Sequence, residues 1–294
     1  MNQLNKRKQN FFNISQSRSI NQLLLEIDTR KTRCIVQAEF SNVGTIHSEK
    51  SDFSLDVEDI TVFRWTPAEK KLLIAVLEDF YINHSAEIHI RISSFAERCG
   101  KKSIKEFRTQ LKMSLNSLKM VEMPIGGERH PVPLVEESKL DHGYIVITLS
   151  PYFLKELKGN PGAVQVPCVF FEINAKQYRH ANDILYYISL MRFLNYNKDQ
   201  RRDHITISKI LDITALPTLA EARNSKNGSI RERIYQPFFS NLDALGQDLR
   251  YELINAAGFP VSVNDAIRMD FYDFQKICIH FKWVHETEFW KTQK

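Results

Sequence analysis

Cysteine is scarce in this sequence and never clustered. The 294 residues include four cysteines, Cys34, Cys99, Cys168 and Cys278, which are widely separated along the chain. The absence of a CxxC pair or a Cys/His cluster argues against a zinc finger or zinc ribbon. Scattered cysteines with apolar neighbours are typical of reduced core residues in a cytoplasmic protein. We therefore expect a cytoplasmic protein with no metal and no cofactor.

Long apolar runs and catalytic motifs are also missing. No apolar run approaches the ~20 residues that cross a bilayer, so no membrane partner is expected. Ten glycines and ten prolines are too few for a fibrous or linker-dominated chain. The sequence has no GxxxxGK[ST], GxGxxG, GxSxG or HExxH motif. These absences predict a protein that is not an enzyme, with no catalytic residue to name.

Helices and strands are predicted in the same order twice. Thr66, followed by Pro67 and Glu69, is typical of a helix start. The first copy then predicts a helix to 81, a strand at 88–92, a helix at 94–98 capped by Ser93, a helix at 104–118 capped by Ser103, and strands at 132–135 and 144–147. The second copy predicts a helix at 180–196, a strand at 204–207, a helix at 209–213 capped by Ser208, a helix at 230–245 capped by Ser229, and strands at 249–253 and 277–283.

This order is that of a winged helix-turn-helix. We predict an α+β protein of two tandem winged helix-turn-helix domains related by an internal repeat. A flexible basic arm is expected at 1–20, an N-terminal winged-helix domain with an extension at 21–158, and a C-terminal one at 163–294. The turn-forming cluster 158–162 separates them. The alternative is chance alternation of helix and strand, as in any α+β protein.

Forty Lys and Arg against 35 Asp and Glu give a net charge of +5, so the distribution of charge matters more than its sum. In the first copy, cations gather on and before the helix at 104–118, opposite its apolar face, which we expect to include Ile104 and Phe107. They are Lys101, Lys102, Lys105, Arg108 and Lys112. Such a face suits entry into a DNA major groove, where phosphates flank the base edges.

The second copy gathers cations around the start of its equivalent helix. The candidate DNA-binding residues there are Arg201, Arg202, Arg223, Lys226, Ser229, Arg231 and Arg233. The segment 222–228 is small and polar, and we expect it to be a flexible link that orders on phosphates. Arg231 and Arg233 diverge on a helix, so only one of them is expected to reach a base. The alternative is that these side chains simply solvate a surface helix.

One stretch resembles a known family. Residues 144–158 (YIVITLSPYFLKELK) read as a strand and short helix, followed by FFEI at 170–173 and ILYYISL at 184–190. This is similar to the junction between the two winged-helix domains of iteron-binding, theta-type plasmid replication (Rep) initiators. TPAEKKLL at 66–73 is similar in place and pattern. The chain departs from the family in a long polar link at 214–228 and in the extended region before Trp65.

The resemblance implies a non-enzymatic initiator that binds repeated origin sites in double-stranded DNA. It also implies recruitment of a host initiator and helicase, and a homodimer formed through the first domain. On that basis the helix at 229–245 makes the principal base contacts, the helix at 103–118 contacts a neighbouring groove or the backbone, and hairpins near 136–143 and 255–270 act as wings.

The predicted function is sequence-specific binding of double-stranded DNA by a plasmid or mobile-element replication initiator. Two alternatives remain open. One is a transcriptional regulator of a phage or mobile element, and the other is a winged-helix adaptor that does not bind DNA. Steep salt dependence would separate the DNA-binding proteins from the adaptor. Directly repeated sites beside the gene would separate an initiator from a regulator.

Overall fold

The computed structural model of the chain describes residues 11–16, 20–21, 24, 44–47, 54–57, 66–123, 132–160, 162–195, 202–214, 216–225, 229–246 and 248–284. Most of the predicted basic arm therefore lies outside the described residues. The chain divides into two compact units, Ile14–Val164 and Met1–Asn13 with Gln165–Lys294. We call them the first and the second unit. Strands β1 (Phe11–Ser15) and β9 (Ala163–Pro167) pair with each other, and a boundary between the two units falls within each strand.

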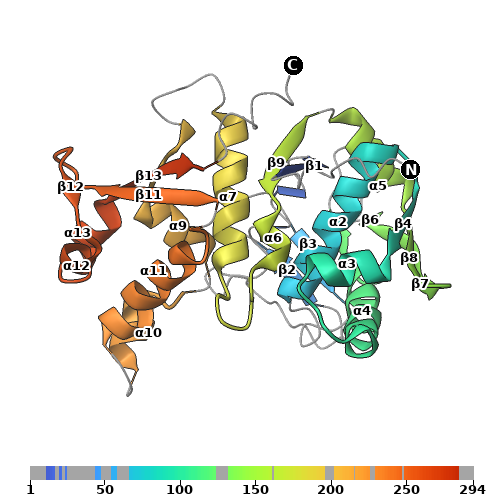
Figure 1. Ribbon diagram of the computed structural model, residues 1–294, viewed down its shortest axis with the longest axis horizontal. Helices are drawn as coiled ribbons and strands as arrows, with labels where there is room; N and C mark the ends of the chain where they lie inside the picture. The colour runs from blue at the N-terminus through green and yellow to red at the C-terminus, as the bar shows by residue number, and fades with distance from the viewer. Residues whose placement is uncertain are drawn as a thin grey trace, which may run out of the picture. The chain divides into compact units, whose positions relative to one another are not determined.

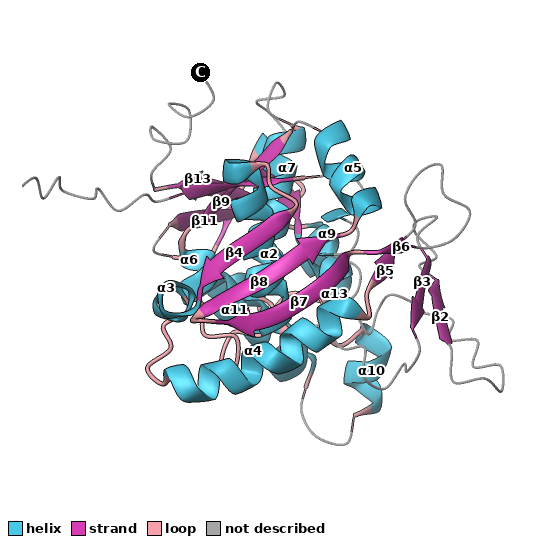
Figure 2. Ribbon diagram, turned by 90° about the vertical axis from the view of Figure 1, so that its right-hand side faces the viewer, coloured by secondary structure: helices cyan, strands magenta, loops and turns pink. Residues whose placement is uncertain are grey.

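In its described residues, the first unit combines helices with three small sheets (Figures 1 and 2). Its elements are β2 (Gly44–His47), β3 (Ser54–Val57), α2 (Pro67–Asn83), β4 (Glu87–Arg91), α3 (Ile92–Arg98), α4 (Ile104–Lys119), β5 (Glu122–Met123), β6 (Val132–Pro133), β7 (Val135–Asp141), β8 (Tyr144–Leu149) and α5 (Pro151–Gly159).

Helix α2 starts where the sequence predicts. The Thr66 hydroxyl accepts from the amide of Glu69, and the Glu69 carboxylate accepts from the amide of Thr66, with Pro67 at the first helical position. This reciprocal cap satisfies two amides that a helix start otherwise leaves unpaired. The helix ends at His84, which adopts a left-handed conformation with φ 51°.

The central sheet of the first unit has the strand order β4-β8-β7, all antiparallel. Helix α4 packs along β7, as Figure 2 shows, and Ser138 of β7 donates to the carbonyl of Leu115 in α4. Apolar side chains of the sheet and helices are fully buried, among them Ile147 and Leu77 at 0% exposure. The order α2-β4-α3-α4-β7-β8 is that of a winged helix, so the prediction for the first copy is confirmed.

The second unit repeats this order with additions. Its elements are α6 (Val169–Glu172), α7 (Ala181–Leu194), β10 (His204–Thr206), α9 (Ile207–Ile213), α10 (Leu219–Asn224), a π-helical turn η1 (Arg231–Tyr235), α11 (Gln236–Asp243), β11 (Leu249–Ile254), β12 (Pro260–Val261), α12 (Val263–Ala266), α13 (Phe271–Lys276) and β13 (Cys278–Trp283). Its sheet has the order β10-β13-β11-β12.

One hydrogen bond recurs in both units and establishes the repeat. The amide of Ile92, first residue of α3, donates to the carbonyl of Gly143, just before β8 (2.9 Å). In the second unit the amide of Ile207, first residue of α9, donates to the carbonyl of Ile277, just before β13 (2.9 Å). Strands β4, β8 and β7 therefore correspond to β10, β13 and β11. The predicted fold of two winged helices related by an internal repeat is confirmed.

The same hydrogen bond explains why two predicted caps are wrong. Ser93 and Ser208 do not cap helices, because α3 already begins at Ile92 and α9 at Ile207, and neither helix has a side-chain cap. The carbonyl from the neighbouring strand satisfies the first helical amide, so no hydroxyl is needed there.

The predicted polar links of the second unit also prove partly helical. Within 214–228, residues Leu219–Asn224 form α10, which starts with a reciprocal cap between Thr218 and Glu221. The predicted flexible segment 222–228 is therefore helical in its first three residues. The predicted wing at 255–270 contains a tight hairpin, β11–β12, followed by α12 and the residues leading to α13. In the described part of the chain, no helix is long and apolar enough to cross a membrane.

Candidate nucleic-acid interface

Helix α4 is held by one apolar face and leaves the rest of its surface open. The Ser103 hydroxyl caps it by accepting from the amide of Glu106 (3.4 Å). Its buried side chains are Phe107, Leu111, Ser114, Leu115 and Leu118. The prediction that Ile104 belongs to this face is wrong, since Ile104 is 44% exposed.

A groove of about 680 Å³ runs between α4 and the turn that joins β7 to β8. Three predicted cations of α4, Lys105, Arg108 and Lys112, line it together and are all exposed. The groove is further lined by Ile92, Ile104, Thr109, Leu140, Asp141, His142 and Gly143. Lys101 and Lys102 are exposed in the turn before α4 and do not line this groove.

The turn between β7 and β8, which we call the first wing, is fixed by its backbone. His142 and Gly143 both have positive φ, 42° and 89°, which only glycine adopts at little cost. The Gly143 carbonyl accepts from Ile92, so the wing is tied to the start of α3. The exposed His142 ring lies 2.5 Å from the Asp141 carboxylate. His142 was not among the predicted site residues, although the polar hairpin that contains it was predicted.

The second unit places its predicted cations in three different settings. Arg223 of α10 and Arg231 of η1 are exposed. Arg233 is half-buried and donates to the hydroxyl of Ser225. Arg202 is 18% exposed along its side chain and pairs with Asp203. Arg201 and Lys226 lie outside the described residues.

Ser229 caps the long helix of the second unit, as predicted. Its hydroxyl accepts from the amide of Glu232 (3.4 Å), and the Glu232 carboxylate accepts from the amide of Ser229 (3.0 Å). The hydroxyl is therefore already engaged by the protein. Among the described residues, no group of three or more His, Cys, Asp or Glu side chains is placed to hold a metal ion.

The core residues of this helix match those of α4 in spacing. Phe107, Leu111, Leu115 and Leu118 of α4 correspond to Ile234, Phe238, Leu242 and Leu245. Between the capping serine and the first core residue, however, the second copy has one more residue than the first. The π-helical turn η1 contains this extra residue, and Pro237, which lacks an amide hydrogen, lies two residues beyond its end.

This correspondence shows that the two long helices present different chemistry. The positions of Arg108 and Lys112 in α4 are those of Tyr235 and Phe239 in the second unit, and both aromatic residues are only 4% exposed. Phe274 of α13 covers them: its ring stacks on Tyr235 at 4.1 Å and lies 6.0 Å from Phe239. The open basic groove of the first unit is therefore replaced by an aromatic cluster in the second.

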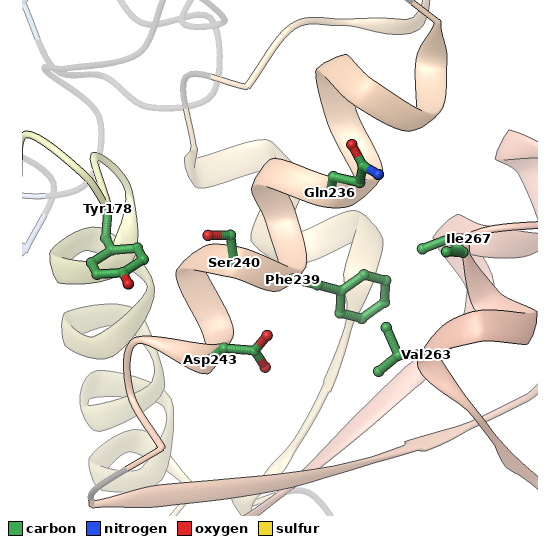
Figure 3. A pocket seen from close by; sticks show the side chains of 7 residues that line it. All are labelled: Tyr178, Gln236, Phe239, Ser240, Asp243, Val263 and Ile267. Atoms are coloured by element: carbon green, nitrogen blue, oxygen red, sulfur yellow. The ribbon is translucent and has the colours of Figure 1, made fainter.

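A separate pocket of about 360 Å³ lies on the neighbouring face of α11 (Figure 3). Its lining residues are Tyr178, Gln236, Phe239, Ser240, Asp243, Val263 and Ile267. Asp243 accepts from the hydroxyl of Tyr251 (2.8 Å); burial raises the pKa of that phenol, and the bond to Asp243 raises it further. The pocket contains one carboxylate and no cation, so it is poorly suited to phosphate.

No family model matches the chain, and no curated protein matches it. Among solved structures, the chain is similar to the Pi initiator protein in a crystal structure with iteron DNA, at 9% identity and a TM-score of 0.49, over 95% of this chain and 99% of that one. It is also similar to a crystal structure of domains 2 and 3 of RctB, at 13% identity and a TM-score of 0.48, over 90% and 98%.

Proposed function

We propose that this chain is a sequence-specific double-stranded DNA-binding protein that initiates replication at repeated sites in the origin of a plasmid or mobile element. The observation that carries the proposal is the groove of the first unit, where Lys105, Arg108 and Lys112 of α4 face the first wing. A winged helix places this helix in the major groove of DNA, with the wing on flanking phosphates.

Each part of the interface has a role in this proposal. Lys105 and Lys112 contact phosphates on either side of the DNA major groove, and Arg108, which lies between them on α4, reaches base edges. In the second unit the exposed cations Arg223 and Arg231 meet the duplex at the corner formed by α10 and η1. Tyr235 and Phe239 are covered by α13. The side of the long helix at 229–245 therefore contributes less to base reading than the family resemblance implies.

The remaining expectations follow from the same role. The protein acts by binding rather than by catalysis, works in the cytoplasm where its DNA lies, and uses no cofactor. An initiator of this kind recruits a host initiator and helicase, and forms a homodimer through its first domain when it is not at the origin.

The test is a titration of the purified protein against the DNA that flanks its own gene, beside a random duplex, at two salt concentrations. Tight binding to direct repeats, with weaker and more salt-sensitive binding to the random duplex, supports the initiator. Specific binding to a promoter without repeats favours the transcriptional regulator. Equal and feeble binding to both duplexes would favour an adaptor without DNA binding.

A further inference from the structure

The hairpin between β11 and β12 in the second unit ends in a rigid tip. The amide of Asn255 donates to the carbonyl of Phe259, and the amide of Gly258 donates back to the carbonyl of Asn255 (both 2.9 Å). The side-chain oxygen of Asn255 accepts from the amides of Ala257 (3.0 Å) and Phe259 (2.9 Å). Gly258 takes a φ of 86°, which this tight turn requires. The tip therefore holds Phe259 in one place.

The chemistry of this tip is unusual for an exposed turn. Phe259 is 67% exposed, and Ala256, Ala257 and Pro260 beside it are exposed as well. The segment 255–263 contains no charged residue. The side chain gains little from packing within the folded unit, because most of its surface stays in water. A bound partner would bury it.

The position of the hairpin indicates its partner. Strand β11 corresponds to β7, so the hairpin leaves the sheet where the first wing begins in the first unit. The first wing lines the basic groove beside α4, which places wing tips next to DNA in the proposed function. The following segment is less suited to that contact, since its exposed carboxylates, Asp265, Asp270 and Asp273, outnumber its exposed cations, Arg268 and Lys276.

We propose that the β11–β12 hairpin is an apolar wedge that inserts Phe259 between base pairs of the bound duplex from the minor groove. Architectural DNA-binding proteins use Phe, Leu or Ile in this way to unstack a base step and kink the duplex. The uncharged tip passes between the phosphates without binding them, while the cations of the protein hold the backbone. This inference rests on the proposed function and adds local duplex distortion to it.

The experiment compares Phe259→Ala with wild type in two measurements on the same origin repeats. Affinity is measured at several salt concentrations, and unstacked thymines are detected by their reactivity with permanganate. We expect wild type to expose thymines at one step in each site. Phe259→Ala should lose this reactivity and bind roughly 5- to 150-fold more weakly, the equivalent of about 1–3 kcal/mol for one base–aromatic contact. The salt dependence should stay the same, since no phosphate contact is removed.

Two further variants make the result specific. Phe259→Trp keeps a large aromatic side chain and should retain thymine reactivity. Tyr272→Ala removes another exposed aromatic residue, 69% exposed on α13, and should behave as wild type. If wild type binds no DNA, the proposed function and the wedge fail together. If wild type binds and Phe259→Ala gives the same reactivity and affinity, the wedge alone is overturned.

Discussion

Arg192, which has no exposed side-chain surface, donates from Nη1 to Oδ1 of Asp203 over 3.1 Å. The same carboxylate accepts from the indole Nε1 of Trp283 (3.1 Å) and from Nε of Arg202 (3.2 Å). The Arg192 guanidinium also lies 5.0 Å from the centre of the Trp283 ring. One carboxylate thus joins α7, the start of β10 and the end of β13.

Replacing Asp203 by alanine should destabilise the second unit strongly. The change leaves the buried Arg192 charge without its carboxylate, and such a change typically lowers the free energy of unfolding by about 3–5 kcal/mol. Urea unfolding of both proteins measures it. Asp273→Ala is the matched control, because its ion pair with Lys276 is exposed to solvent and should contribute little to stability. Equal destabilisation in the two variants would contradict the role of the buried pair.

His204 should make the stability of the protein depend on pH. Burial lowers the pKa of His204, and the ring of His280, stacked on it at 4.1 Å, lowers it further, while Asp203 opposes both. The unfolded chain therefore binds a proton at this residue more readily than the folded chain. The contribution of His204 to the free energy of unfolding is fully present above a pH of about 6.5. It is lost as the pH falls towards the lowered pKa of the folded state.

The measurement is the free energy of unfolding of wild type and His204→Gln between neutral and mildly acidic pH. The variant should lose less stability on acidification than wild type. Parallel curves for the two proteins would show that His204 titrates with the same pKa in both states.

Gly143, the glycine of the first wing, should tolerate substitution poorly. Its φ of 89° is strained for any side chain, although nothing lies within 4 Å of an added Cβ. Gly143→Ala should therefore lower the free energy of unfolding by roughly 1–2 kcal/mol through backbone strain alone. Gly159→Ala also meets nothing within 4 Å and has no positive φ, so it should be neutral or slightly stabilising. A neutral Gly143→Ala would contradict the wing geometry.

Lys105 and Lys112 should contribute to DNA affinity through charge rather than sequence. Each alanine variant should weaken binding about evenly on specific and random duplexes. Each should also reduce the slope of log affinity against log salt by about 0.9, because one lysine no longer neutralises a phosphate. Lys155→Ala, an exposed lysine of α5 outside the groove, is the control and should leave the slope unchanged. An unchanged slope in the α4 variants would remove this helix from the interface.

Arg231 and Arg233 should behave differently in the second unit. Arg231 is exposed, and its alanine variant should lose about 1–3 kcal/mol of discrimination between specific and random duplexes if it reads a base. Arg233 contacts Ser225, so its variant should act by loosening the connection between α10 and η1. Competition binding with single-base substitutions in the site measures both effects. Retained affinity and sequence preference in both variants would rule out this helix as a reader.

The winged-helix order was predictable because its helices carry local signals. The hydroxyls of Thr66, Ser103 and Ser229 all accept hydrogen bonds from backbone amides, as predicted for capping residues. The spacing of the buried apolar residues of α4 from Phe107 onward is also as predicted. Helix α10 was missed although Thr218 and Glu221 have the spacing of a reciprocal cap. The polar residues around them favour a loop, which hides that signal.

The covering of the second long helix was not predictable from local pattern. Tyr235 and Phe239 are apolar at helical spacing, but nothing in the sequence says which element covers them. Phe274 reaches them through tertiary packing, from a short helix that starts with a cap by Asp270. The groove of the first unit likewise depends on the backbone of Gly143, which only the folded wing reveals.

The extra residue in η1 has a consequence for symmetry. A π-helical turn bonds residue i to residue i+5 and so contains about one residue more than an α-helical turn. Turn η1 therefore takes up the added residue without rotating the capped first turn far from the phase that it has in α4. The two copies differ in their side chains instead, since Arg108 and Lys112 of α4 have the buried Tyr235 and Phe239 as counterparts. In the proposed function, the two copies should therefore not read the same base sequence, and the recognised site should be internally asymmetric.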